Sequence, residues 1–113
     1  MFHTVWAEKK IRRGELWTAI MCVNGYLKTK LITIIEMYEH CVHGTAYDTW
    51  HNGRMAEQWA EPFIVDKLGD CFSRYDADDL LSALTATREL FLTLAKECAP
   101  AYGYTTGIPE IDS

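Results

Sequence analysis

Apolar residues recur every three or four positions through most of this chain, which is the spacing of a helix with one buried face. The longest such stretch covers residues 15–42 and predicts a helix about 40 Å long. A second covers residues 77–99 and follows Asp76, a good N-cap residue. The repeating positions are Leu16, Ile20, Val23, Leu27, Leu31, Ile34, Tyr38 and Val42 in the first stretch, and Leu80, Leu84, Thr87, Phe91, Leu94 and Cys98 in the second.

Shorter helical segments surround these two stretches, and no segment shows a convincing strand pattern. We expect further helices over residues 2–12, 55–60 and 62–75. Residues 43–54 break the period and contain two glycines, so they predict an ordered loop. The pattern therefore predicts an all-α fold: an up-and-down helical bundle forming a single domain over residues 1–113.

The charge balance limits what such a bundle can bind. Eleven Lys and Arg against sixteen Asp and Glu give a net charge of -5, which argues against nucleic acid and membrane surfaces and favours cationic ligands. No apolar run approaches the roughly 20 residues of a membrane span, and the first ten residues lack a signal-peptide core, so we expect a cytoplasmic protein. The four scattered cysteines are expected to be reduced, mostly buried thiols.

Two polar residues interrupt the apolar face of the long helix. Asn24 falls inside the apolar arc, and Lys28 lies one turn further on, beside Trp17 and Met21. One interpretation is a ligand-facing strip on which Lys28 meets an anion such as a phosphate. The other is structural: a buried amide satisfied by a neighbouring helix and a lysine that extends to solvent.

The central loop offers further candidate contacts. Trp50, His51 and Arg54 could stack on or hydrogen-bond a ligand, although Trp50 and Trp59 could equally close the end of the bundle. No metal site is expected at His40, Cys41 and His43, because these side chains diverge on a helix.

Several segments resemble the C-terminal helical domain of bacterial aminoglycoside nucleotidyltransferases, most closely the streptomycin 6-adenylyltransferase group. The resemblance rests on residues 13–19, on Asn24-Gly25-Tyr26-Leu27-Lys28 leading to residues 35–38, on Gly53-Arg54, and on residues 76–95 with 102–104. It covers nearly the whole chain.

The resemblance implies a substrate-binding domain that lacks the catalytic nucleotidyltransferase domain. ATP and magnesium would need that missing domain, so no cofactor is expected in this chain. In the family, an acidic residue on the long helix accepts a proton from the attacking hydroxyl, and a base four positions later meets the nucleotide phosphate. Asn24 and Lys28 occupy these positions, but an amide cannot act as a base, so Asp48 or another carboxylate would have to replace it.

The candidate site therefore comprises Asn24 at the catalytic position, Lys28 for phosphate, and six substrate contacts. The six are Trp17, Met21, Asp48, Trp50, His51 and Arg54. The expected partners are an aminoglycoside-like cationic molecule and a nucleotidyltransferase domain in cis or in trans. On its own, the chain is not expected to be an enzyme.

A stand-alone, HEPN-like helical interaction protein is the alternative. It would form a homodimer or pair with a separate minimal nucleotidyltransferase, and it would cover the surfaces of Trp6, Trp17 and Trp50. Ribonuclease activity is disfavoured, because no arginine is followed by a histidine five to seven positions later.

Overall fold

A computed structural model of the chain describes residues 2–50 and 53–98, and all regular elements in these ranges are helical. The helices are α1 (Phe2–Arg12), α2 (Leu16–Met21), α3 (Leu27–His43), α4 (Ala56–Trp59), α5 (Pro62–Leu68) and α6 (Ala77–Cys98). A π-helical turn, η1 (Cys22–Tyr26), joins α2 to α3, and a 3-10 turn, η2 (Gly69–Cys71), follows α5. The predicted all-α fold is confirmed.

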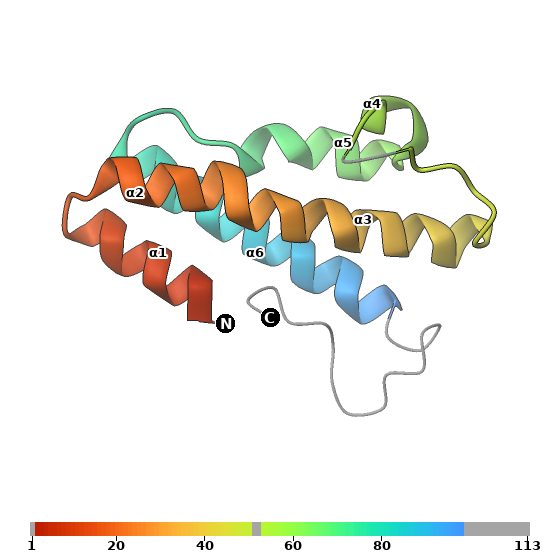
Figure 1. Cartoon of the computed structure of the whole chain (residues 1–113), viewed down its shortest axis with the longest axis horizontal. Coiled ribbons are helices and arrows are strands. Elements are labelled where there is room, and N and C mark those ends of the chain that lie inside the picture. Colours follow the sequence, from red (N-terminus) through yellow and green to blue (C-terminus); the bar gives the residue numbers. More distant parts are fainter. Residues whose placement is uncertain (1, 51–52, 99–113) are drawn as a thin grey trace.

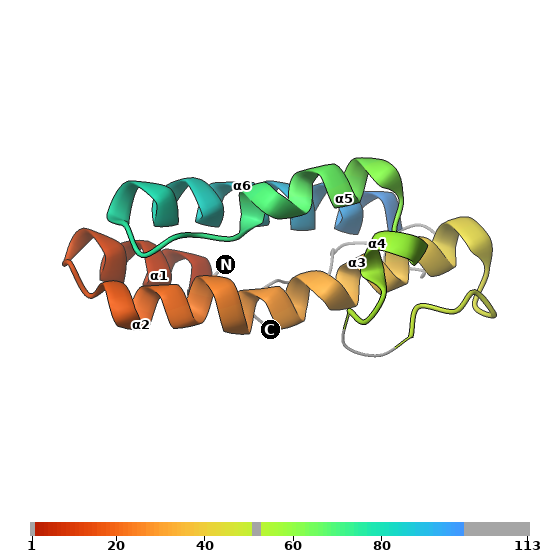
Figure 2. The same cartoon turned by 90° about the horizontal axis from the view of Figure 1, so that it is seen from above.

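Four helical segments form an up-and-down bundle. In Figure 1, α1, the continuous α2–α3 segment, α5 and α6 run in alternating directions along the long axis. Seen from above, α5 and α6 lie on one side, and α1, α2 and α3 lie on the other (Figure 2). None of the helices in the described ranges is long and apolar enough to cross a membrane.

The core follows the apolar spacing of the two long helices. All six positions predicted on α6 are buried, and so are Val23, Leu27, Leu31 and Ile34 on the first helix. Of the other four positions on the first helix, Val42 is half-exposed near the end of α3, and three are partly buried: Leu16, Ile20 and Tyr38. No disulfide joins the four cysteines, and three of them are buried, as predicted.

The helix predicted over residues 62–75 is shorter than expected. It ends as α5 at Leu68, and after η2 the backbone becomes extended at Phe72. Side-chain oxygens accept the backbone N–H groups that would bond within a longer helix. The Ser73 N–H donates to Asn24, and the Arg74 N–H donates to Asp79. Asp79 donates its own N–H to the Asp76 carboxylate, which confirms Asp76 as the N-cap of α6.

Candidate functional site

Asn24 lies in the π-helical turn and binds the backbone of a distant residue. Its Nδ2 donates to the Ser73 carbonyl oxygen at 2.9 Å, and its Oδ1 accepts from the Ser73 N–H, also at 2.9 Å. Single π-turns within α-helices are rare and occur frequently at functional sites. Here the turn carries the amide that holds the connection between η2 and α6. The structural interpretation expected a buried amide satisfied by a neighbouring helix, but Asn24 is partly buried and its partner is backbone outside the helices.

Lys28 reaches from α3 toward the interior of the bundle. Its Nζ donates to the Val23 carbonyl oxygen at 2.7 Å and to Thr87 Oγ1 at 2.8 Å, and it lies 5.1 Å from the centre of the Phe72 ring. Burial disfavours the charged form and lowers the pKa of the ammonium from its ordinary value of 10.5 to about 8. Lys28 is therefore a partly desolvated cation, held in place by two acceptors.

Thr87 connects Lys28 to two other elements. Its hydroxyl is fully buried and lies within donating distance of the Ala83 carbonyl oxygen at 2.7 Å and the Cys71 carbonyl oxygen at 3.2 Å. A hydroxyl has one proton and two lone pairs, so it can donate to these carbonyls while accepting from Lys28. The network fixes the ammonium relative to α6 and η2.

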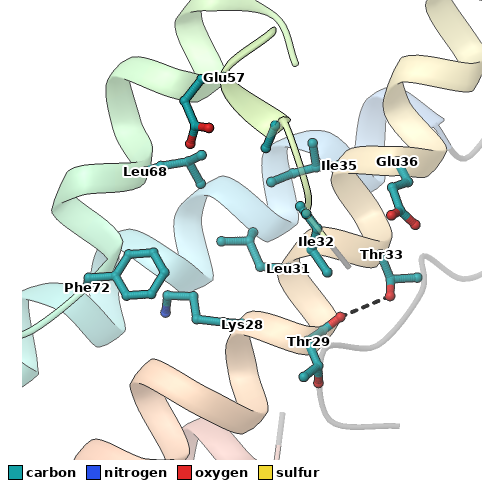
Figure 3. Close-up of a pocket in the computed structure, with 12 residues that line it drawn as sticks. Lys28, Thr29, Leu31, Ile32, Thr33, Ile35, Glu36, Glu57, Leu68 and Phe72 are labelled. Carbon is teal, nitrogen blue, oxygen red and sulfur yellow. Dashed lines mark hydrogen bonds between the residues drawn. The ribbon is translucent and has the colours of Figure 1, made fainter. Parts of the chain in front are cut away.

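Lys28 also lines an open pocket of about 560 Å³ between α3, α4 and the end of α5. Its other polar lining residues are Thr29, Thr33, Glu36 and Glu57, and its apolar lining includes Leu31, Ile32, Ile35, Leu68 and Phe72. Figure 3 shows Lys28 extending toward the Phe72 ring, with Glu57 and Glu36 at two other edges. The volume is in the range of small-molecule sites, and the pocket combines one cation with two acidic groups.

Trp17 and Met21 lie on open surface, outside the lining of this pocket. Trp17 is 67% exposed and Met21 is 56% exposed, one turn apart on α2. Phe72 and Tyr75, in the segment that Asn24 holds, are also more than a third exposed. Trp17 and Met21 thus do not share the pocket with Lys28, although the sequence places all three beside Asn24.

The candidates in the central loop contact one another. Asp48 Oδ1 accepts the Trp50 N–H at 2.9 Å, and the Arg54 guanidinium lies 5.2 Å from the centre of the Trp50 ring. Trp59 is buried and donates its indole N–H to the Arg54 carbonyl, so it packs into the bundle end, whereas Trp50 remains exposed. His51 lies outside the described residues. Among the loop residues that the structure describes, Gly53 alone lines the pocket.

Sequence reasoning missed a second polar cluster, at the end of α3. Glu39 is buried on this helix, and it lies near His43 and Glu61, which are 3.0 Å apart. Glu39 follows Ile35 by four positions on the apolar face, and this was the available signal. His40 is directed elsewhere, because its Nε2 lies 2.9 Å from the Tyr47 carbonyl oxygen.

The comparisons with known proteins give one family. The model of the family described as streptomycin adenylyltransferase matches residues 1–110. Searches of curated proteins and of solved structures found no match.

Proposed function

Because the chain belongs to the streptomycin adenylyltransferase family, we propose that it is the substrate-binding helical part of an adenylyltransferase-like protein of the cytoplasm. It acts with a nucleotidyltransferase domain, in cis or in trans. That domain holds ATP and magnesium and performs the transfer, so this chain supplies binding groups only.

The observation that carries this proposal is the pocket beside Lys28. It is open to solvent, it has a volume of about 560 Å³, and its acidic residues Glu36 and Glu57 lie apart from its single lysine. Carboxylates at these edges suit a cationic aminoglycoside such as streptomycin, as does the net charge of -5. Thr29 and Thr33 donate their hydroxyl protons to the backbone, and their oxygens remain able to accept from the hydroxyls of a sugar.

Lys28 is proposed to meet a phosphate group of the nucleotide. At pH 7 the ammonium is mostly charged, because its pKa is about 8. An approaching phosphate would favour the charged form further and raise that pKa. An ammonium has three donors, and two of them are used by Val23 and Thr87, so the remaining one can turn from the Phe72 ring toward a phosphate.

Asn24 has no proposed role in proton transfer. An amide is not a base, and both of its polar ends already bind Ser73. Its proposed role is to position residues 72–75 beside α2. The carboxylate that receives the hydroxyl proton then comes from elsewhere, and in this chain Glu36 and Glu57 line the pocket while Asp48 does not.

The nucleotidyltransferase domain is proposed to cover the exposed apolar surface formed by Trp17, Met21, Phe72 and Tyr75. The Asn24–Ser73 contact joins the two segments that carry these residues. Exposed apolar groups gathered in this way are typical of interaction surfaces.

A calorimetric titration of the chain with streptomycin tests substrate binding. We expect saturable binding that Glu57→Gln weakens by about threefold or more, since the variant removes one pocket charge. Glu97→Gln is the matched control, because it removes the same charge from an exposed position on α6 outside the pocket. The absence of saturable binding, or equal weakening by both variants, would contradict the proposal.

Sedimentation distinguishes the second candidate, a stand-alone interaction protein that forms a homodimer through the same exposed surface. A concentration-dependent dimer that Trp17→Ala disrupts, together with no binding of streptomycin, would favour that candidate. A monomer that binds the drug supports the substrate-binding function.

A further inference from the structure

Glu39 is a buried carboxylate in an unusual environment. Its side chain on α3 is fully buried, and neither carboxylate oxygen has a hydrogen-bond partner in the described part of the chain. Burying an ionised carboxylate without a partner is costly, and such groups usually bind a cation or become neutral. By contrast, the buried side chain of Thr87 has partners.

Two further metal-binding groups converge on Glu39. His43 lies one turn later on α3, and Glu61 is the residue before α5. One ligand atom from each of the three side chains lies within 4.8 Å of the other two, and His43 Nε2 is 3.0 Å from Glu61 Oε1. Ligands about 2.1 Å from a tetrahedral zinc ion are about 3.4 Å apart, so small side-chain movements would complete the geometry.

The surroundings orient the imidazole and leave the cluster accessible. The Tyr47 ring stacks on the His43 ring, with the ring centres 4.2 Å apart, and the Tyr47 hydroxyl donates to the Trp59 carbonyl oxygen at 2.7 Å. A pocket of about 390 Å³ has both His43 and Glu61 in its lining, which gives an ion a route from solvent.

The electrostatics of the cluster also favour a cation. Burial raises the pKa of Glu39, and the nearby Glu61 carboxylate raises it further. The imidazoles of His43 and His40 and the nearby Glu61 backbone N–H act in the opposite direction and lower the pKa of Glu39. Burying the Glu39 carboxylate beside the second carboxylate of Glu61 is unfavourable, and a bound cation would offset that cost.

We propose that Glu39, His43 and Glu61 bind a divalent metal ion of the zinc class, with water completing the coordination. The mixed oxygen and nitrogen donor set suits zinc. Magnesium, a hard cation, prefers oxygen ligands from carboxylates and water. Binding releases any proton held by the Glu39 carboxyl. The ion would connect the end of α3 to the start of α5, and this inference does not depend on the proposed function.

Calorimetric titration of the chelator-treated chain with zinc chloride at pH 7 tests the site. We expect one zinc ion per chain, with Glu39→Gln and His43→Gln each weakening binding by at least about tenfold. The matched control is His40→Gln, which removes a histidine from the same helix but outside the cluster, and which should change the affinity less than about threefold.

Cysteine thiols could bind zinc in place of the proposed site, so the titration is repeated with Cys41→Ser. Cys41 is the one thiol that is not fully buried, and it interacts with Cys98. Cys41→Ser should also leave zinc affinity within about threefold of the unmodified chain. Loss of zinc binding in Cys41→Ser, with retention in Glu39→Gln and His43→Gln, would overturn the proposal, as would the absence of binding to the unmodified chain.

Thermal unfolding supplies a second readout in case the His43 variant fails to fold. Glu39→Gln replaces a buried acid with a neutral amide of the same size, so without metal it should be at least as stable as the unmodified chain. Zinc should raise the Tm of the unmodified chain and leave that of Glu39→Gln unchanged. Equal Tm increases in both proteins would contradict the site.

Discussion

At the scale of single residues, Lys28 shows how a charge can be kept inside a small bundle. The ammonium has exchanged water for the Val23 carbonyl and the Thr87 hydroxyl, and burial has lowered its pKa to about 8. In the unfolded chain the same group would stay protonated up to about pH 10.5, its ordinary pKa. Lys28 therefore makes stability depend on pH in a predictable direction.

Between about pH 8 and pH 10.5 the unfolded state holds a proton on Lys28 that the folded state has released. The Lys28 contribution to the free energy of unfolding should therefore rise with pH across this window, by up to about 3 kcal/mol. Cys71 and Cys98 oppose this trend, since burial raises the pKa of each thiol, that of Cys98 to about 12. The free energy of unfolding of the unmodified chain and of Lys28→Met is measured by denaturant unfolding across this pH range. The difference between the two proteins at each pH is the Lys28 contribution. A difference that does not change with pH would contradict it.

Asn24→Ala tests the role of the amide. The variant removes two hydrogen bonds and leaves the Ser73 backbone groups without their side-chain partner, which should cost about 1–3 kcal/mol in urea unfolding. Asn24→Asp should also lose stability, because a carboxylate repels the Ser73 carbonyl oxygen. Gln58→Ala, at an exposed amide, should stay within about 0.5 kcal/mol of the unmodified chain. Full stability in Asn24→Ala would show that the contact with Ser73 contributes nothing.

Single residues also show how far the site can be predicted from sequence. The position of Asn24 in an apolar arc indicates a polar contact with another part of the chain, and the contact that the structure shows is partly buried. Its partner could not be predicted, because it is the backbone of Ser73, 49 residues away. Glu39 and Glu61 were missed for the same reason: helical spacing relates Glu39 to His43, but only the tertiary fold brings Glu61 to them.

At the scale of elements, the two long helices could be predicted and the connections between them could not. Periodicity identified the buried faces of both, since the 3.6-residue repeat depends only on sequence. The early end of α5 depends on backbone donors satisfied by Asn24 and Asp79, which belong to other elements. The π-turn had no signal in the spacing, because its single extra residue is absorbed within a continuous helix.

Replacing Gly25 or Gly44 with alanine should change the stability of the protein in opposite directions. Gly25 has a helical backbone, and a Cβ there would contact nothing within 4 Å, so Gly25→Ala should stabilise the protein by about 0.5–1 kcal/mol. Gly44 ends α3 at a φ of 94°, which alanine adopts only with strain, so Gly44→Ala should destabilise it by about 1 kcal/mol or more. Thermal unfolding of both variants checks the pair, and a loss of stability in Gly25→Ala would contradict the first.

At the scale of the whole molecule, the structure separates two surfaces. The pocket beside Lys28 lies between α3, α4 and α5, whereas Trp17 and Met21 lie on α2. Phe72 belongs to both, because it lines the pocket and is also part of the exposed apolar surface, so a domain proposed to cover that surface would lie at the Phe72 edge of the pocket.

The most direct test of this account is an NMR titration of the isotopically labelled chain with streptomycin. We expect saturable shifts at the backbone amides of four residues that line the pocket: Thr29, Ile32, Gly53 and Glu57. Amides near Ser82 and Thr85, on the exposed face of α6, should not move. Saturable binding that shifts only residues outside the pocket, or no shift at any concentration, would contradict the assignment of this pocket to the substrate.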